Sequence, residues 1–186
     1  MTIPAWTPAG ILPPFIGADA TQRQPGGRSP YPVTLNDMVT RFATSTHRIE
    51  LMIGFVNFRK ALHAEGLTSG MQWLDGSFVE DVEHHRPARP SPGDMDVITI
   101  LPAPGPADVT PQRVQLFDPA YTKATFHVDS YPIEVDGDVP SLVDDVTYWF
   151  GLFSHRRATF EWKGILAISL TPDGEDDALQ SLTMLT

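Results

Sequence analysis

A Gly-Ser turn and two acidic residues are the parts of this chain best suited to chemistry. The turn ends the segment Trp73–Ser77. The acids, Asp94 and Asp96, alternate with apolar residues within Pro92–Leu101. Because successive side chains of a strand point to opposite faces, the two carboxylates share one face. Paired carboxylates repel each other unless a cation lies between them, and Mg²⁺ binds carboxylates together with substrate phosphates. The pattern therefore predicts a site for a divalent metal and a phosphate.

This arrangement resembles the signature of the DNA polymerase beta-like nucleotidyltransferase superfamily, in which Gly-Ser precedes a strand reading Asp, apolar, Asp. A closer resemblance, to an uncharacterised bacterial family of nucleotidyltransferase-like proteins, covers roughly residues 10 to 170. Four segments carry it: Trp73–Glu80, Pro92–Asp96, His127–Tyr131 and Thr147–Arg157.

The resemblance implies an activity and a set of ligands. The reaction is the transfer of a nucleoside monophosphate from an NTP such as ATP to an acceptor hydroxyl, on RNA, a protein or a small molecule. Mg²⁺ or Mn²⁺ is the implied cofactor. Asp94, Asp96 and Asp129 are the implied metal ligands and catalytic residues, with Asp129 supplied by a later strand. The remaining candidates for the third carboxylate are Asp118 and Asp136.

Two further groups of residues are candidates for binding the nucleotide. Backbone N–H groups at Gly76 and Ser77, with the serine hydroxyl, suit triphosphate oxygens, although a glycine with positive φ in a plain turn explains the same pair. Arg156 and Arg157 suit a triphosphate too, but cations also favour a helix C-terminus, and either guanidinium is a possible partner of Asp129. Other possible phosphate partners are Lys123 and Lys163.

Composition narrows the class of protein. At 186 residues the chain is long enough for one core and too short for two ordinary ones. No apolar run is long enough to span a bilayer, so we expect no membrane association. The net charge of −10 disfavours binding to extended nucleic-acid duplex. Cysteine is absent, which excludes disulfides and thiolate catalysis and fits a cytoplasmic location.

The elements that must position these residues predict an α+β fold. We expect an irregular, Pro- and Gly-rich N-terminal arm over residues 1–33, a domain over 34–172, and an acidic turn and C-terminal tail over 173–186. The resemblance implies that the domain is nucleotidyltransferase-like, with a mixed β-sheet packed against helices. Sixteen residues separate Ser77 from Asp94, and this long connection either closes over a substrate or forms a solvated excursion.

Apolar spacing predicts the individual elements. Thr34, with Asp37 three residues later, predicts an N-cap, and one or two helices follow as far as Gly66. A helix is also predicted over Ser141–His155, where we expect the aromatic residues to be core rather than to stack a base. A Pro-rich loop is expected over Pro102–Pro111, and a short helix after the acidic turn. Strands are predicted over Met71–Leu74, Met95–Leu101, Thr125–Val135 and Gly164–Leu170.

A second function class competes with the enzyme. The same fold without catalysis would serve as a nucleotide-sensing or protein-interaction module, for example in a toxin-antitoxin or phage-related pair. The acidic charge, the arm and the long connection after Ser77 suit a protein partner.

Overall fold

The computed structural model describes residues 3–17, 27–86, 90–105, 108–157 and 159–186, so parts of the predicted arm and of two predicted loops lie outside it. Within these ranges the helices and strands follow in the order β1 (Tyr31–Val33), α1 (Leu35–Phe42), α2 (Thr46–Ala64), β2 (Met71–Asp75), the 3₁₀ helix η1 (Gly76–Val79), α3 (Val82–His85), β3 (Met95–Pro102), α4 (Pro111–Gln115), α5 (Pro119–Phe126), β4 (Val128–Val135), α6 (Val139–Phe153), β5 (Leu166–Ser169) and α7 (Glu175–Thr183).

The strands form one mixed sheet in the order β1-β5-β2-β3-β4. The outer pairs, β1 with β5 and β3 with β4, are parallel, whereas β5 with β2 and β2 with β3 are antiparallel. The α+β fold class with a mixed sheet is therefore confirmed. Strand β1 was missed, because three residues are too few to show a period, and its sequence was assigned to the irregular arm.

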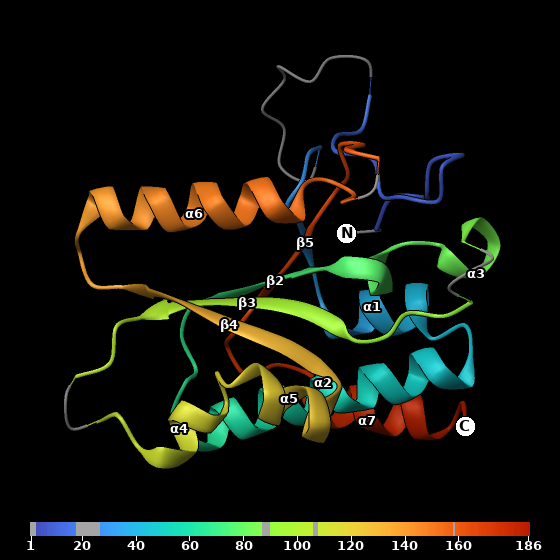
Figure 1. The fold of residues 1–186 in the computed structure, drawn as a ribbon. Helices are drawn as coiled ribbons and strands as arrows, with labels where there is room; N and C mark the ends of the chain where they lie inside the picture. The colour runs from blue at the N-terminus through green and yellow to red at the C-terminus, as the bar shows by residue number, and fades with distance from the viewer. Residues whose placement is uncertain (1–2, 18–26, 87–89, 106–107, 158) are drawn as a thin grey trace.

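Helices cover the two faces of the sheet unequally (Figure 1). Helices α1, α2, α5 and α7 lie on one face, where the larger core cluster includes Phe42, Phe55 and Leu182. Among the helices of the described residues, α6 alone lies along the other face, against a smaller cluster that includes Trp73 and Ile98. No helix in the described ranges is both long and apolar enough to cross a membrane.

The predicted helix signals are confirmed. Thr34 is the N-cap of α1: its hydroxyl accepts the N–H of Asp37 at 3.1 Å, and the Asp37 carboxylate accepts the N–H of Thr34 at 3.0 Å. Ser45 caps α2, and Gly66 follows that helix with a φ of 78°. In α6, Phe153 is buried in the smaller cluster, and Trp149 and Phe150 are partly buried and pack against it.

Two predicted boundaries were wrong. The strand predicted from Thr125 begins only at Val128, because α5 occupies the preceding residues, with Asp118 as its N-cap and Pro119 in its first turn. The acidic turn predicted ahead of the last helix is partly helical: α7 begins at Glu175 and has three carboxylates in its first turn, where the helix dipole favours negative charge.

Helices α2 and α5 approach each other closely at a glycine. A β-carbon at Gly54 of α2 would overlap the carbonyl oxygen of Phe126, the last residue of α5. The next residue, His127, ends α5 in the left-handed conformation and leads into β4. Gly54 thereby lets α5 and the start of β4 lie against α2.

Candidate functional site

A cleft of about 370 Å³ opens where β2 ends and β3 and β4 begin, beside the last turn of α6. All seven residues that the sequence predicts for the site line this cleft, and its other lining residues include several charged side chains. The predicted residues that line it are Gly76, Ser77, Asp94, Asp96, Asp129, Arg156 and Arg157. The charged residues that join them are Asp75, Glu80, Arg86, Lys123 and Lys163.

Three carboxylates form a row across the sheet. Asp75 of β2 is directly opposite Asp96 of β3, and Asp96 is directly opposite Asp129 of β4. Since side chains directly opposite each other in neighbouring strands lie on one face, the row places three acids side by side. Asp94, two residues before Asp96, extends the group on the same face. We call Asp75, Asp94, Asp96 and Asp129 the carboxylate row.

The row is electrostatically strained. Burial, and then the neighbouring Asp94 and Asp129, raise the pKa of Asp96 to about 6. Burial raises the pKa of Asp75 to about 7, against the opposing effect of the Lys163 ammonium. Oδ1 of Asp75 and Oδ1 of Asp129 are buried and have no hydrogen-bond partner among the described residues. Unpartnered buried oxygens beside mutually repelling acids are typical of a place prepared for a ligand.

The Gly76–Ser77 turn is fitted to this row. Gly76 has a φ of 77°, and a β-carbon there would overlap the Asp96 carboxylate. Glycine is therefore needed for both its conformation and its size. The Ser77 hydroxyl is buried and lacks a hydrogen-bond partner within the described part of the chain. The structure thus brings the turn against the acids, as the sequence pattern predicted.

Two lysines contact the carboxylate row. Nζ of Lys123, on α5, lies 2.6 Å from Oδ2 of Asp129 and 3.4 Å from Oδ2 of Asp94. Nζ of Lys163 is buried, 2.9 Å from Oδ2 of Asp75. The cation that contacts Asp129 is thus Lys123, rather than either of the arginines considered from the sequence.

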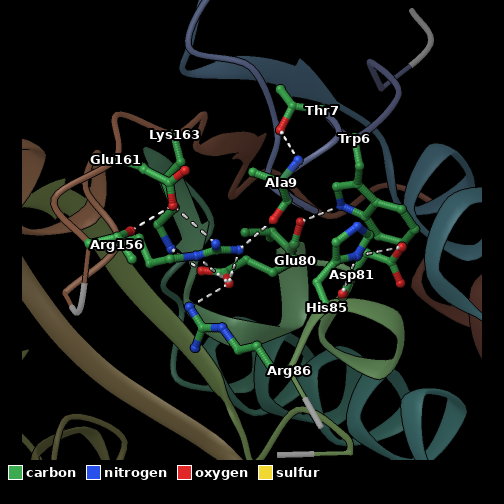
Figure 2. Close-up of polar contacts among 12 residues, drawn as sticks. Trp6, Thr7, Ala9, Glu80, Asp81, His85, Arg86, Arg156, Glu161 and Lys163 are labelled. Carbon is green, nitrogen blue, oxygen red and sulfur yellow. Dashed lines mark hydrogen bonds and ion pairs between the residues drawn. The ribbon is translucent and has the colours of Figure 1, made fainter.

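Arg156 belongs to a separate ion network around Glu80 (Figure 2). The buried Glu80 carboxylate accepts hydrogen bonds from Nε and Nη2 of Arg156 at 3.2 and 3.1 Å. It also contacts Nη2 of Arg86 at 2.8 Å and Nζ of Lys163 at 3.2 Å. Nη1 of Arg156 contacts Glu161 at 3.1 Å. We call Glu80 and its three cations the Glu80 network.

Arg157 differs from its neighbour. It is exposed, lines the cleft and forms no ion pair with any described residue. Its charge nevertheless acts on Asp96, since it is among the groups that hold the pKa of that carboxyl down against burial. Of the two predicted arginines, Arg157 is the one whose guanidinium is available to a ligand.

The N-terminal arm lies beside the residues that follow the Gly76–Ser77 turn, where Trp6 and Ala9 approach Glu80 and Asp81 (Figure 2). The indole N–H of Trp6 donates to the carbonyl oxygen of Val79 at 2.8 Å. The N–H of Asp81 donates to the carbonyl oxygen of Gly10 at 2.9 Å, and Arg156 donates to that of Ala9 at 3.0 Å. The arm therefore supports η1 and the chain that follows it.

The residues present suit a divalent cation in chemistry. Carboxylate oxygens are the donors that Mg²⁺ and Mn²⁺ prefer, and a cation would relieve the repulsion from Asp94 and Asp129 that adds to the effect of burial on the pKa of Asp96. As the described side chains stand, no group of three or more His, Asp and Glu is arranged to hold a metal ion. Lys123 lies between Asp94 and Asp129. The donors therefore fit, and the position of Lys123 is the feature that any metal site must accommodate.

Sequence reasoning missed Asp75, Glu80 and the part played by Lys163. For Asp75 a signal existed, because strand alternation places it on the same face as Trp73, next to the Gly-Ser turn. For Glu80 none was available, since its partners Arg156 and Lys163 are 76 and 83 residues away along the chain.

Comparison with known proteins identifies the family. A search of curated proteins found no match, and a search of solved structures found none. A model for DUF6932, a family of unknown function, matches residues 4–169, a range that contains the whole carboxylate row and the Glu80 network. The chain belongs to the DUF6932 family.

Proposed function

We propose that this protein is a metal-dependent nucleotidyltransferase, related to the DNA polymerase beta-like superfamily. It transfers a nucleoside monophosphate from an NTP to an acceptor hydroxyl and releases pyrophosphate. The observation that carries the proposal is the register of β3 and β4, which sets Asp96 opposite Asp129, with Asp94 on the same face and Gly76–Ser77 beside them. The acceptor, whether RNA, protein or small molecule, is open, and a cytoplasmic location belongs to the same proposal.

Each residue has a part in the proposed reaction. Asp94, Asp96 and Asp129 would hold Mg²⁺ or Mn²⁺, which when bound would neutralise charge on the triphosphate. Asp129 takes the proton of the acceptor hydroxyl. The hydroxyl oxygen then bonds to the α-phosphorus as the bond from that phosphorus to the bridging oxygen breaks, and the electron pair leaves with pyrophosphate.

The remaining residues position the triphosphate. The Ser77 hydroxyl and the N–H groups of its turn donate to the phosphate oxygens, and Arg157, which also lines the cleft, supplies positive charge. Arg156 acts indirectly, because its guanidinium is bound to Glu80 and Glu161. Catalysis on this account is mainly positioning and charge stabilisation.

The test compares wild type with Asp96→Asn. Each variant is incubated with labelled NTPs, Mg²⁺ or Mn²⁺, total RNA and cell lysate, and label in RNA, protein and small molecules is measured. We expect Asp96→Asn to lower transfer at least about 1,000-fold, because several kcal/mol of charge stabilisation depend on the metal. Asp145→Asn, an exposed acid on α6, is the matched control and should transfer as wild type does. Equal transfer by wild type and Asp96→Asn contradicts the proposal.

One observation favours the second function class. Lys123 contacts two of the three predicted metal ligands, and such neutralisation is also what a protein that has lost catalysis would show. That protein would be a nucleotide-sensing or protein-interaction module. Binding of an NTP without any transfer product, by wild type and by Asp96→Asn alike, is the result that this alternative predicts.

A further inference from the structure

Lys123 joins two acids of the carboxylate row that come from different strands. Its Nζ is 2.6 Å from Oδ2 of Asp129, on β4, and 3.4 Å from Oδ2 of Asp94, which precedes β3. An ammonium donates hydrogen bonds and accepts none, so it holds the two carboxylates together as a small cation would. A divalent ion bound to these same two oxygen atoms would have to displace it.

The contacts of Lys123 leave a different pair of carboxylates open. Oδ1 of Asp129 is buried and has no hydrogen-bond partner among the described residues. Asp96 lies directly opposite, and neither lysine of the cleft forms an ion pair with it in the described part of the chain. Among the described residues, these are the oxygens of the Asp94, Asp96 and Asp129 group that no lysine contacts.

The backbone around Lys123 holds it at this place. Helix α5 ends at Phe126 against Gly54 of α2, and the left-handed His127 turns the chain directly into β4. Lys123 and Asp129 are therefore carried by one short, closely packed segment. Their contact follows from the path of the chain as well as from the attraction between the charges.

Polymerase-type phosphoryl transfer sites commonly use two divalent cations. We infer that Lys123 takes the place of one of them here, so that Asp96 and Asp129 would hold a single divalent ion. The inference rests on the proposed function for the presence of a metal. To the proposed function it adds the number of divalent ions bound, which is one, and the residue that sets this number, which is Lys123. Lys123 is thereby a positioning residue, which orients Asp94 and Asp129.

Binding of Mn²⁺ to the nucleotide-free full-length protein tests the inference without any need for activity. Titration followed by electron paramagnetic resonance counts bound ions from the loss of the free Mn²⁺ signal. Wild type should bind one ion and Lys123→Met two, while Lys123→Arg, which keeps the charge, should bind one. Lys60→Met is the matched control: Lys60 has 46% side-chain exposure against 45% for Lys123 and is also paired with an aspartate, but it lies outside the cleft. It should bind one ion.

Each outcome has a distinct meaning. Two ions on wild type, or one on a folded Lys123→Met, overturns the inference and leaves the proposed function standing. No Mn²⁺ on either protein overturns the inference and the metal dependence of the proposed function together. Circular dichroism melting of each variant establishes that the protein counted is folded. Should Lys123→Met not fold, Lys123→Gln, which also removes the charge but keeps a polar side chain, should bind two ions, and a single ion on folded Lys123→Gln overturns the inference. One ion on wild type, Lys123→Arg and Lys60→Met, with two on Lys123→Met, supports the inference.

Discussion

The carboxylate row and the Glu80 network share a cleft and are both built from charged residues with little exposure, but their charges are arranged in opposite ways. In the Glu80 network one buried carboxylate is surrounded by Arg86, Arg156 and Lys163, all within 3.2 Å. In the carboxylate row acids lie beside acids, and two buried oxygen atoms have no partner among the described residues.

This difference distinguishes charged residues that stabilise the fold, as in the Glu80 network, from charged residues that are available to a ligand, as in the carboxylate row. A buried ion that is fully paired holds elements together, and removing one partner is costly. A buried ion that is incompletely paired weakens the fold and is retained where function needs it. Lys163 links the two regions, because its ammonium contacts both Asp75 and Glu80. The Glu80 network therefore helps to hold Lys163 where it contacts Asp75 of the carboxylate row.

The largest effect is expected in the Glu80 network. Glu80→Gln removes the charge that compensates three cations, and we expect it to lower the free energy of unfolding by about 3–5 kcal/mol. Urea denaturation monitored by tryptophan fluorescence measures this change. Glu161→Gln is the matched control, since Glu161 also contacts Arg156 but is 40% exposed, and it should lower the free energy of unfolding far less than Glu80→Gln does. Similar losses in the two variants would remove the distinction between the network and an ordinary surface pair.

Removing a charge from the carboxylate row should raise the free energy of unfolding near neutral pH, whereas removing one from the Glu80 network lowers it. The pKa of Asp96 is raised from 3.8 to about 6, so the folded protein holds this proton more tightly than the unfolded chain does. The resulting stability is present below the unfolded-state pKa and is lost as the pH rises through about 6. By linkage, the two-unit shift corresponds to about 3 kcal/mol at most.

Asp96→Asn should therefore be more stable than metal-free wild type near neutral pH, by up to about 3 kcal/mol, with the advantage vanishing near pH 4. Urea denaturation in a chelator, repeated across this pH range, measures the difference. Added Mn²⁺ should stabilise wild type and not the variant. An advantage that does not change with pH would show that Asp96 is not the strained acid.

A smaller loss of stability is expected when the contact between the Gly76–Ser77 turn and the carboxylate row is disturbed. Gly66 and Gly76 have nearly equal φ values, 78° and 77°, but a β-carbon meets nothing within 4 Å at Gly66 and overlaps Asp96 at Gly76. Gly66→Ala should cost about 1–2 kcal/mol for the backbone alone. Gly76→Ala should cost about 1–2 kcal/mol more, through the overlap, and should weaken Mn²⁺ binding. Equal costs with unchanged Mn²⁺ binding would mean that the turn does not position the acids.

Local signals predicted much of the fold. The N-cap at Thr34, the end of α2 before Gly66 and the periodicity of α6 each depend on neighbours within a few residues, and all were confirmed. Helix α5 was missed although Asp118 and Pro119 form a start signal, because only a single buried residue, Thr122, lies within it.

The site was predicted in part, for a physical reason. Asp94 and Asp96 are related by alternation along one strand, which the sequence shows directly. Asp96 lies opposite Asp129 and Asp75 because of the register between the strands, and the packing of whole elements sets that register. The contacts of Glu80 with Arg156 and Lys163 depend on the same long-range packing. Lys123 meets Asp129 through the turn at His127 between α5 and β4, an element boundary that the prediction from sequence missed.

The close approach at Gly54 has a consequence for comparisons between relatives. Helix α5 carries Lys123 and leads into the strand of Asp129, so a larger side chain at Gly54 would displace the end of α5 and with it the positions of both residues. In a DUF6932 chain with a bulkier residue at this position, we expect a compensating change near Phe126 or the loss of the lysine. Position 54 and the end of α5 would then vary together among DUF6932 sequences, and this covariation would show that the two segments are in contact.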